Sequence, residues 1–144
     1  MAQYDFMIAG RWRNKEAVQE VLDAVRAAGK TAYCFLENAY KGDKVEFHRN
    51  DDIEATMQSM EALNQDDPFV RRVFETDIQA ERDAESLVLV LPAGISGHIE
   101  AGIAYGLGKP CYAVGPLEKT ETLYCVFDKI FPTPSEFIKY VEGQ

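Results

Sequence analysis

Short apolar runs, typical of strands, alternate along this chain with apolar repeats at helical spacing. Residues 4–9 form an apolar run that Gly10 closes. From Asn14 onward, apolar residues recur at the 3.6-residue spacing of an amphipathic helix, and Gly29 fits the position just after its end. Residues 31–36 are β-branched and aromatic, which favours a second strand. The chain is therefore predicted to begin with a strand, a loop, a helix and another strand.

The middle of the chain carries a weaker pattern. Residues 37–52 are polar and show no sustained period, so we expect a mobile loop there, followed by a weakly helical stretch over 53–63. Asp66 and Asp67 before Pro68 are typical of a helix start, and the charged amphipathic pattern over 69–84 predicts the helix itself.

The second half returns to a strong alternation of elements. Residues 87–91, LVLVL, have no polar alternation, which is typical of a strand buried on both faces of a parallel sheet. A small-residue loop and a helix are expected over 92–108. Two further strands and a terminal helix are predicted over 111–115, 123–127 and 134–141.

Strands and helices alternate from end to end, which favours right-handed βαβ units. We therefore expect one α/β domain over residues 1–144. Its centre would be a doubly wound, mainly parallel five-stranded sheet of the flavodoxin-like or Rossmann-like type, with helices on both faces.

Composition and charge exclude several classes of protein. The apolar fraction of 47% and the charged fraction of 27% are those of a folded globular protein. Lys and Arg number 15 against 24 Asp and Glu, and the net charge of −9 disfavours nucleic acid polymers and anionic membranes as partners. No apolar run approaches the roughly 18–20 residues of a membrane span or makes a secretory signal, so a cytoplasmic protein is expected.

The three cysteines, Cys34, Cys111 and Cys125, form no CxxC or Cys/His cluster with zinc-like spacing. We expect buried thiols in a reducing compartment, no metal site and no cofactor. A small anionic metabolite stays compatible with the negative charge, because a helix N-terminus and one or two arginines can bind a phosphate.

Open parallel sheets bind ligands at the loops that leave the carboxyl ends of their strands. Two such loops are predicted, over residues 10–14 and 92–98, and they should be neighbours in space. In the second loop, Ser96 fits a helix N-cap and Gly97 would let a ligand approach the backbone. The free N–H groups of the first turn would then accept an anion.

Glu100 is expected in that first turn, where the helix dipole would keep its carboxylate ionised and suit it to act as a nucleophile. The alternative is that Ser96 and Glu100 only cap the helix. The segment GISGHIEAG lacks the G-x-G-x-x-G order of a dinucleotide fingerprint, so an NAD oxidoreductase is weakly supported.

Three features together resemble the nucleoside 2-deoxyribosyltransferases and their relatives, the nucleoside 5′-monophosphate N-glycosidases. These features are FMIAGRW at 6–12, Asp77, and GISGHIEAGIAYGLGKPCYAV at 94–114. The resemblance covers most of the chain, although residues 37–67 contribute nothing to it.

The resemblance implies that Glu100 attacks the anomeric carbon and holds the sugar covalently, before water or a second base takes it. It implies that Asp77 lies near the sugar and the base of a small-molecule nucleoside or nucleotide. The alternative for Asp77 is an exposed charge on a helix with Glu75, Glu81 and Asp83. It further implies a homodimer or larger assembly in which a neighbouring subunit completes the site.

Two positions depart from the transferases. Gly94 stands where they carry an aspartate that contacts the base, and Phe6 stands where they carry a tyrosine that helps to hold the nucleophile. Hydrolysis of a nucleoside 5′-monophosphate is therefore favoured over base transfer, with Ser96, Arg11 and Arg13 to hold the phosphate. Each arginine alone is alternatively a surface charge.

Trp12, close to Gly10, would either stack on a nucleobase or be buried in the core or in its loop. His98 would either donate to a ligand or be incidental. Three other functions stay open: a nucleoside 2-deoxyribosyltransferase, an NAD glycohydrolase of the Toll/interleukin-receptor-like type, and a non-catalytic nucleotide-binding or sensing module.

Overall fold

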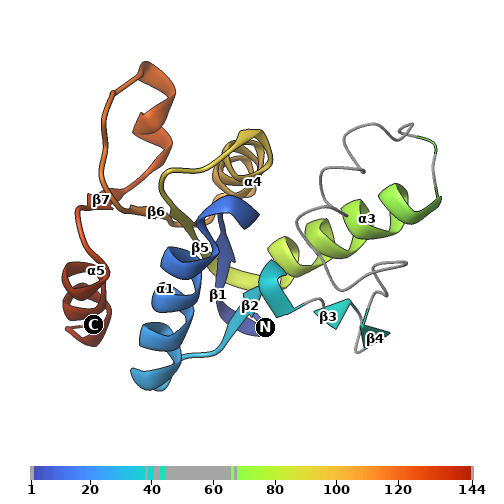
Figure 1. Cartoon of the computed structure of the whole chain (residues 1–144), viewed down its shortest axis with the longest axis horizontal. Coiled ribbons are helices and arrows are strands. Elements are labelled where there is room, and N and C mark those ends of the chain that lie inside the picture. Colours follow the sequence, from blue (N-terminus) through green and yellow to red (C-terminus); the bar gives the residue numbers. More distant parts are fainter. Residues whose placement is uncertain (1, 38, 41–42, 45–65, 67, 144) are drawn as a thin grey trace.

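The computed structural model describes residues 2–37, 39–40, 43–44, 66 and 68–143. At its centre is a five-stranded parallel sheet in the order β2-β1-β5-β6-β7 (Figure 1). Its strands are β1 (Tyr4–Ala9), β2 (Ala32–Cys34), β5 (Ala84–Val90), β6 (Cys111–Val114) and β7 (Lys129–Phe131). The helices are α1 (Lys15–Ala27), α3 (Pro68–Asp83), α4 (Ile95–Gly106) and α5 (Pro134–Glu142), and the 3₁₀ turns are η1 (Trp12–Asn14), η2 (Phe35–Glu37) and η3 (Thr122–Val126).

The strand order places β1 and β5 side by side at the centre of the sheet. From β1 the chain turns to one side to form β2, and from β5 it turns to the other side to form β6 and β7. The sheet is thus doubly wound, and the switch in strand order falls between β1 and β5, where such sheets bind ligands. The predicted fold class is confirmed.

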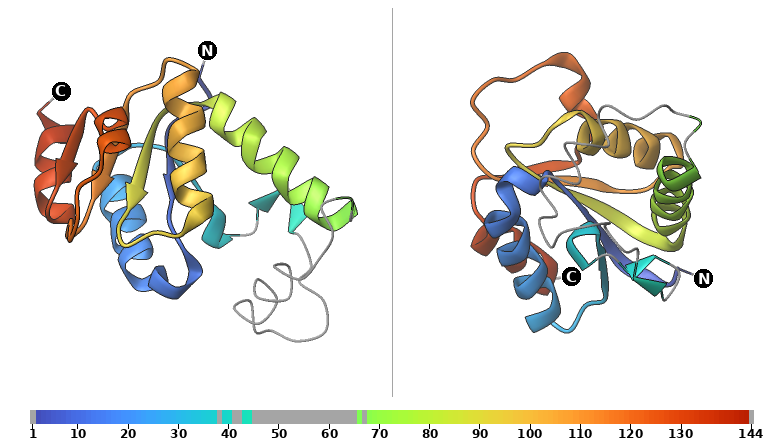
Figure 2. Two further views of the ribbon diagram at one scale, coloured as in Figure 1. Left: turned by 90° about the horizontal axis from the view of Figure 1, so that it is seen from above. Right: turned by 45° about the vertical axis from the view of Figure 1, so that its right-hand side comes forward.

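Helices cover both faces of the sheet (Figures 1 and 2). Alternate strand residues such as Ile8 and Val88 pack against α1 and α5 on one face. Their neighbours Met7, Leu87 and Leu89 face the other way, in the core that includes residues of α3 and α4. This two-sided burial explains why β5 reads as an unbroken apolar run.

The last strand does not lie where the sequence predicts it. Residues 122–126 form η3, in which the backbone N–H of Leu123 donates to the side chain of Glu121. Leu123 itself is 73% exposed, so this segment buries too little apolar surface for a central strand. Pairing with β6 begins only after Asp128, whose N–H donates to the carbonyl of Cys111 at 2.7 Å and whose carboxylate accepts from the Cys111 N–H at 3.1 Å.

The segment expected as a featureless loop contains a short antiparallel ladder, formed by β3 (Ala39–Tyr40) and β4 (Asp43–Lys44). That part of the prediction is wrong. The helix predicted over 53–63 and the helix-start residue Asp67 lie outside the described residues. Cys34 and Cys111 are buried as expected, whereas Cys125 is exposed.

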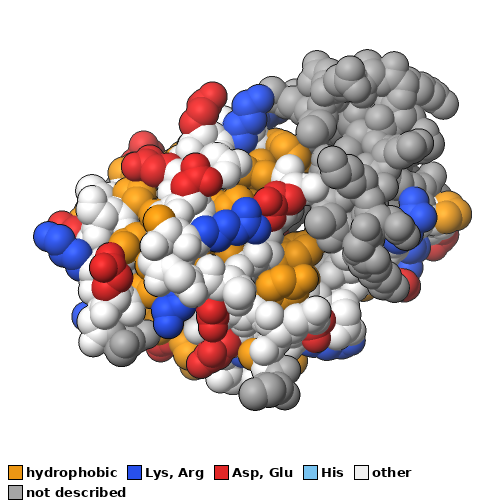
Figure 3. Space-filling model, turned by 90° about the horizontal axis from the view of Figure 1, so that it is seen from below, with side chains coloured by type: hydrophobic (Ala, Val, Ile, Leu, Met, Phe, Trp, Pro, Cys, Tyr) orange, Lys and Arg blue, Asp and Glu red, His pale blue; other side chains and the backbone are white. Residues whose placement is uncertain are grey.

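Charged side chains of both signs are interspersed with apolar ones on the face drawn in Figure 3, and the basic ones gather in no large patch there. Within the described ranges, every helix is too short or too polar to cross a membrane.

Candidate active site

Three carboxyl groups lie close enough to act on one another between α3 and α4. Asp77 and Glu81 are one turn apart on α3, so they project from the same flank of that helix. Glu100 projects from α4, which packs beside α3 on the same face of the sheet. Sequence reasoning singled out Asp77 and Glu100 but treated Glu81 as an exposed charge, and the structure corrects that treatment because Glu81 is only 1% exposed.

Glu100 is the sixth residue of α4, so it lies in the second turn of the helix, and the first turn holds no acidic residue. The expectation of an ionised first-turn carboxylate is therefore wrong. Burial is the main cause that raises the pKa of Glu100 well above its ordinary value, and the nearby Asp77 and Glu81 carboxylates add to the rise. The surroundings of Glu100 thus favour its neutral form over its charged form.

Asp77 has a partner that favours its charged form. Burial raises the pKa of Asp77 to about 6, while the hydroxyl of Tyr33 donates to its Oδ1 at 3.1 Å and acts in the opposite direction. Near neutral pH, Asp77 therefore gives up its proton more readily than Glu81 does. Asp77 is thus half-buried and hydrogen-bonded, unlike the fully exposed surface charge of the alternative interpretation.

The Glu81 carboxyl group lacks a hydrogen-bond donor of the kind that Tyr33 provides to Asp77, among the described residues. Neither of its carboxylate oxygens makes a hydrogen bond of normal geometry with the described residues. Burial and then the charge of Asp77 raise the pKa of Glu81 to about 8, against weaker opposing effects from Lys109 and the backbone of Ala104. The ammonium of Lys109 donates instead to the carbonyls of Arg82, at 2.9 Å, and Ala84. The only sequence signal for Glu81 is its i+4 spacing from Asp77.

The two loops at the carboxyl ends of β1 and β5 are neighbours, as predicted. The side-chain amide of Asn14 donates to the carbonyls of Leu91, at 3.2 Å, and Pro92, at 3.4 Å. These hydrogen bonds tie the start of α1 to the loop that leads into α4. Two hydrogen bonds therefore hold together the two loops at the switch point, which form the rim of the site.

The first turn of α4 differs from the prediction. The N-cap is Gly94, which offers no side-chain hydrogen bond, and Ser96 is an exposed residue of the first turn. Ser96 is therefore not the cap. The N–H groups of this turn have no capping side chain and keep the capacity to bind an anion.

Gly97 and Gly10 serve packing. A Cβ on Gly97 would meet Cδ1 of Leu89 at 2.6 Å, so α4 lies too close to β5 for any side chain there. A Cβ on Gly10 would meet Cγ2 of Val18 at 2.7 Å. Packing of α4 against β5 therefore accounts for the glycine at position 97.

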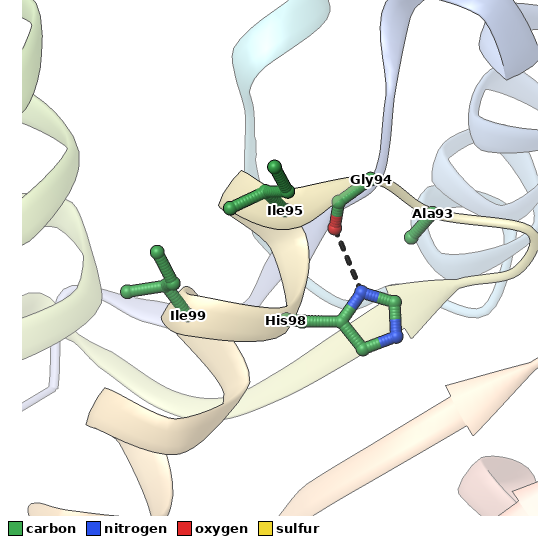
Figure 4. A pocket seen from close by; sticks show the side chains of 5 residues that line it. All are labelled: Ala93, Gly94, Ile95, His98 and Ile99. Atoms are coloured by element: carbon green, nitrogen blue, oxygen red, sulfur yellow. Dashed lines mark hydrogen bonds between the residues drawn. The ribbon is translucent and has the colours of Figure 1, made fainter.

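A hollow of about 510 Å³ opens beside the first turn of α4 (Figure 4). Its walls are mostly apolar and come from Ala93, Gly94, Ile95, His98 and Ile99. This volume is within the usual range of ligand pockets. Because His98 contacts η3 whereas Glu100 interacts with α3, the hollow and the carboxyl cluster lie on different flanks of α4.

His98 is held at both ring nitrogens. Its Nδ1 lies 2.7 Å from the carbonyl oxygen of Gly94, which can only accept, so Nδ1 carries the proton (Figure 4). In the neutral ring, Nε2 then accepts from the hydroxyl of Tyr124 at 2.8 Å, and the two rings are stacked. His98 thus joins the start of α4 to η3, which gives it a structural role that sequence reasoning missed.

The remaining candidates near β1 are distributed over both faces of the sheet. Phe6 points to the face of α1 and α5, where its ring centroid lies 5.7 Å from that of Phe137, so its side chain lies on the opposite face of the sheet from α4. The Trp12 ring packs edge-on against that of Phe35, with the ring centroids 5.3 Å apart, as the alternative of a packed side chain predicts. Arg11 is half-buried and Arg13 exposed in the loop after β1.

Among the residues that the structure describes, no group of three or more His, Cys, Asp or Glu side chains is arranged to hold a metal ion. The chemistry available at the site is that of carboxyl groups that exchange protons.

Together, the doubly wound sheet and the carboxyl cluster between α3 and α4 define an α/β protein with a candidate acid–base site. No protein-family model and no curated protein sequence matches the chain. Among solved structures it is similar to a 2-deoxyribosyltransferase from Bacillus psychrosaccharolyticus, with a TM-score of 0.67 and 20% identity over 94% of this chain and 90% of that one. It is also similar to a conserved protein from Enterococcus faecalis V583, with a TM-score of 0.67 and 14% identity over 99% of both chains. The expected 2-deoxyribosyltransferase-like fold is thus confirmed.

Proposed function

We propose that this protein is an N-glycosidase that cleaves the glycosidic bond of a nucleoside 5′-monophosphate or a related nucleoside, with Glu100 as the nucleophile. The observation that carries the proposal is the half-buried pair of carboxyl groups, Glu100 on α4 and Asp77 on α3. The likeness of the fold to a 2-deoxyribosyltransferase supports it.

Cleavage of a glycosidic bond requires one anionic carboxylate and one proton donor. Burial raises the pKa values of both Asp77 and Glu100, and the charge of Asp77 adds to the rise at Glu100, so the pair favours keeping a proton more than isolated carboxyl groups would. When substrate binds, the proton of Glu100 passes to Asp77. The pair then offers a nucleophile and an acid with no change in total charge.

The reaction then follows two displacements. The carboxylate of Glu100 attacks the anomeric carbon, the carbon–nitrogen bond breaks, and the base leaves with the bonding electron pair and the proton of Asp77. Water next attacks the same carbon and gives its proton to Asp77, and the bond to Glu100 breaks. The products are the free base and the free sugar or sugar phosphate.

The start of α4 supports a phosphorylated substrate. Its first turn has no capping side chain and carries the positive end of the helix dipole, a suitable position for a 5′-phosphate. Ser96 is exposed on this turn, and Arg11 stands in the loop after the neighbouring strand.

We also propose a homodimer. The outer face of α4 beside the hollow exposes Ile95 and Ile99, which are 81% and 56% accessible, and a second copy would cover this apolar surface. The mass of the protein in solution, measured by light scattering after gel filtration, tests this expectation, and a strictly monomeric mass would contradict it.

The activity is tested by incubating the purified protein with a panel of ribo- and deoxyribonucleosides and their 5′-monophosphates, followed by chromatography for free base. We expect release from at least one monophosphate and a loss of roughly 10³-fold or more in Glu100→Gln. Glu75→Gln is a matched control, because Glu75 is an exposed residue of α3. Equal release by the wild type and Glu100→Gln would overturn the proposal.

The same assay separates the alternatives. Exchange with an added second base would identify a nucleoside 2-deoxyribosyltransferase. Release of nicotinamide from NAD would identify an NAD glycohydrolase, and tight nucleotide binding without any turnover would identify a binding or sensing module.

A further inference from the structure

The proposed reaction leaves one buried carboxyl group without a role. Glu81 is among the largest fully buried side chains of the protein and is 1% exposed. Neither of its oxygens makes a hydrogen bond of normal geometry with the described residues. A polar group buried without a partner lowers stability, so its presence here requires an explanation.

Several charged or titratable groups among the described residues interact with Glu81. Asp77 precedes it by one turn on α3, Glu100 faces it from α4, and Lys109 lies beyond the end of α4. On the sheet side, the thiol of Cys111 on β6 also senses its charge. Lys109 does not neutralise Glu81 directly, because its ammonium donates to two backbone carbonyls.

Among the described residues, Glu81 therefore has no bonded counter-ion, and it interacts with both carboxyl groups of the proposed reaction. A hydrophobic residue of similar size would fill the same space without the burial cost of a carboxyl group. A group that only packed α3 against α4 would not need to be ionisable.

We propose that Glu81 is a positioning residue that keeps a proton on the Asp77–Glu100 pair, so that the pair retains its acid at neutral and alkaline pH. The carboxyl of Glu81 supplies a third proton-binding position behind the pair. Any negative charge on Glu81 acts through the low-dielectric interior and makes loss of the last proton from the pair unfavourable. Glu81 touches no substrate in this scheme.

If Glu81 has this role, its replacement should change the titration midpoint of the Glu100 carboxyl group. In protein labelled with ¹³C at the glutamate carboxyl carbons, the Glu100 resonance is assigned by its disappearance in Glu100→Gln and followed across pH. In Glu81→Gln, the midpoint of this resonance should move down by about one unit or more, because a like charge has been removed from its surroundings. Glu81→Met should give the same shift if the buried amide of Gln impairs folding, and Glu81→Asp should restore part of the wild-type midpoint.

The kinetic part of the test rests on the proposed function. In Glu81→Gln, the alkaline limb of the pH profile of kcat should move to lower pH by a similar amount, with kcat near pH 6 within about threefold of the wild type. A merely structural role would lower kcat at all pH values alike. The control Glu75→Gln, on the exposed side of the same helix, should change neither the titration nor the profile.

The two proposals fail separately. An unchanged Glu100 midpoint in both Glu81→Gln and Glu81→Met would overturn the role of Glu81, whether or not the protein releases base. A shifted midpoint in a protein that releases no base from any substrate would support the role of Glu81 in holding the proton and refute the proposed glycosidase.

Discussion

Replacing Glu81 by Gln should change how the stability of this protein depends on pH. In the folded protein, burial and the charge of Asp77 raise the pKa of Glu81 from an ordinary value of 4.5 to about 8. Between these two pH values the folded chain keeps a proton that the unfolded chain loses. The free energy of unfolding must therefore fall as pH rises through this window, because the folded state alone binds the proton.

The magnitude follows from the width of the window. Each pKa unit corresponds to 1.36 kcal/mol, so a single group with this shift removes about 4–5 kcal/mol of stability between pH 4.5 and 8. The stabilisation is fully present below pH 4.5 and is lost as pH approaches 8. An amide does not titrate, so Glu81→Gln should lose less stability over the same range.

The measurement is urea unfolding at pH 5, 6, 7 and 8, followed by far-ultraviolet circular dichroism, for the wild type, Glu81→Gln and Glu75→Gln. From pH 5 to pH 8, the unfolding free energy of the wild type should fall by several kcal/mol more than that of Glu81→Gln. Glu75→Gln should follow the wild type. If the curves of the wild type and Glu81→Gln run parallel across this range, Glu81 does not hold a proton in the folded state and the reasoning fails.

Two predictions concern the rim of the site. Gly97→Ala should lower the free energy of unfolding by about 1–3 kcal/mol, because its Cβ would meet Leu89 at 2.6 Å, whereas Gly102→Ala, with nothing within 4 Å, should raise it by up to about 1 kcal/mol. Equal effects of these two substitutions in urea unfolding would contradict the close approach of α4 to β5. Asn14→Ala should cost about 1–2 kcal/mol in the same measurement, because it removes two hydrogen bonds to the loop before α4. It should also lower kcat for base release, and an unchanged kcat would show that this loop does not position α4 for the reaction.

Local sequence patterns were sufficient for the architecture. The period of apolar residues over 15–27 and the unbroken run over 87–91 depend on neighbours along the chain, and they predicted α1 and β5. The parallel order of the strands then placed the loops after β1 and β5 together, as the hydrogen bonds of Asn14 show. The pattern was least informative near η3, where side-chain contacts with Glu121 and Asp128 decide which residues join the sheet.

The properties of the carboxyl groups were decided by tertiary structure. The sequence marked Glu100 as the candidate for chemistry, but its helix position alone suggested an ionised side chain, whereas packing against α3 raises its pKa. The burial of Glu81 and the orientation of Phe6 likewise depend on which elements meet across the sheet. Desolvation and charge–charge interaction act through space, so residues far apart in the sequence set the protonation of this site. The amino-acid sequence determines only which residues are available to the site.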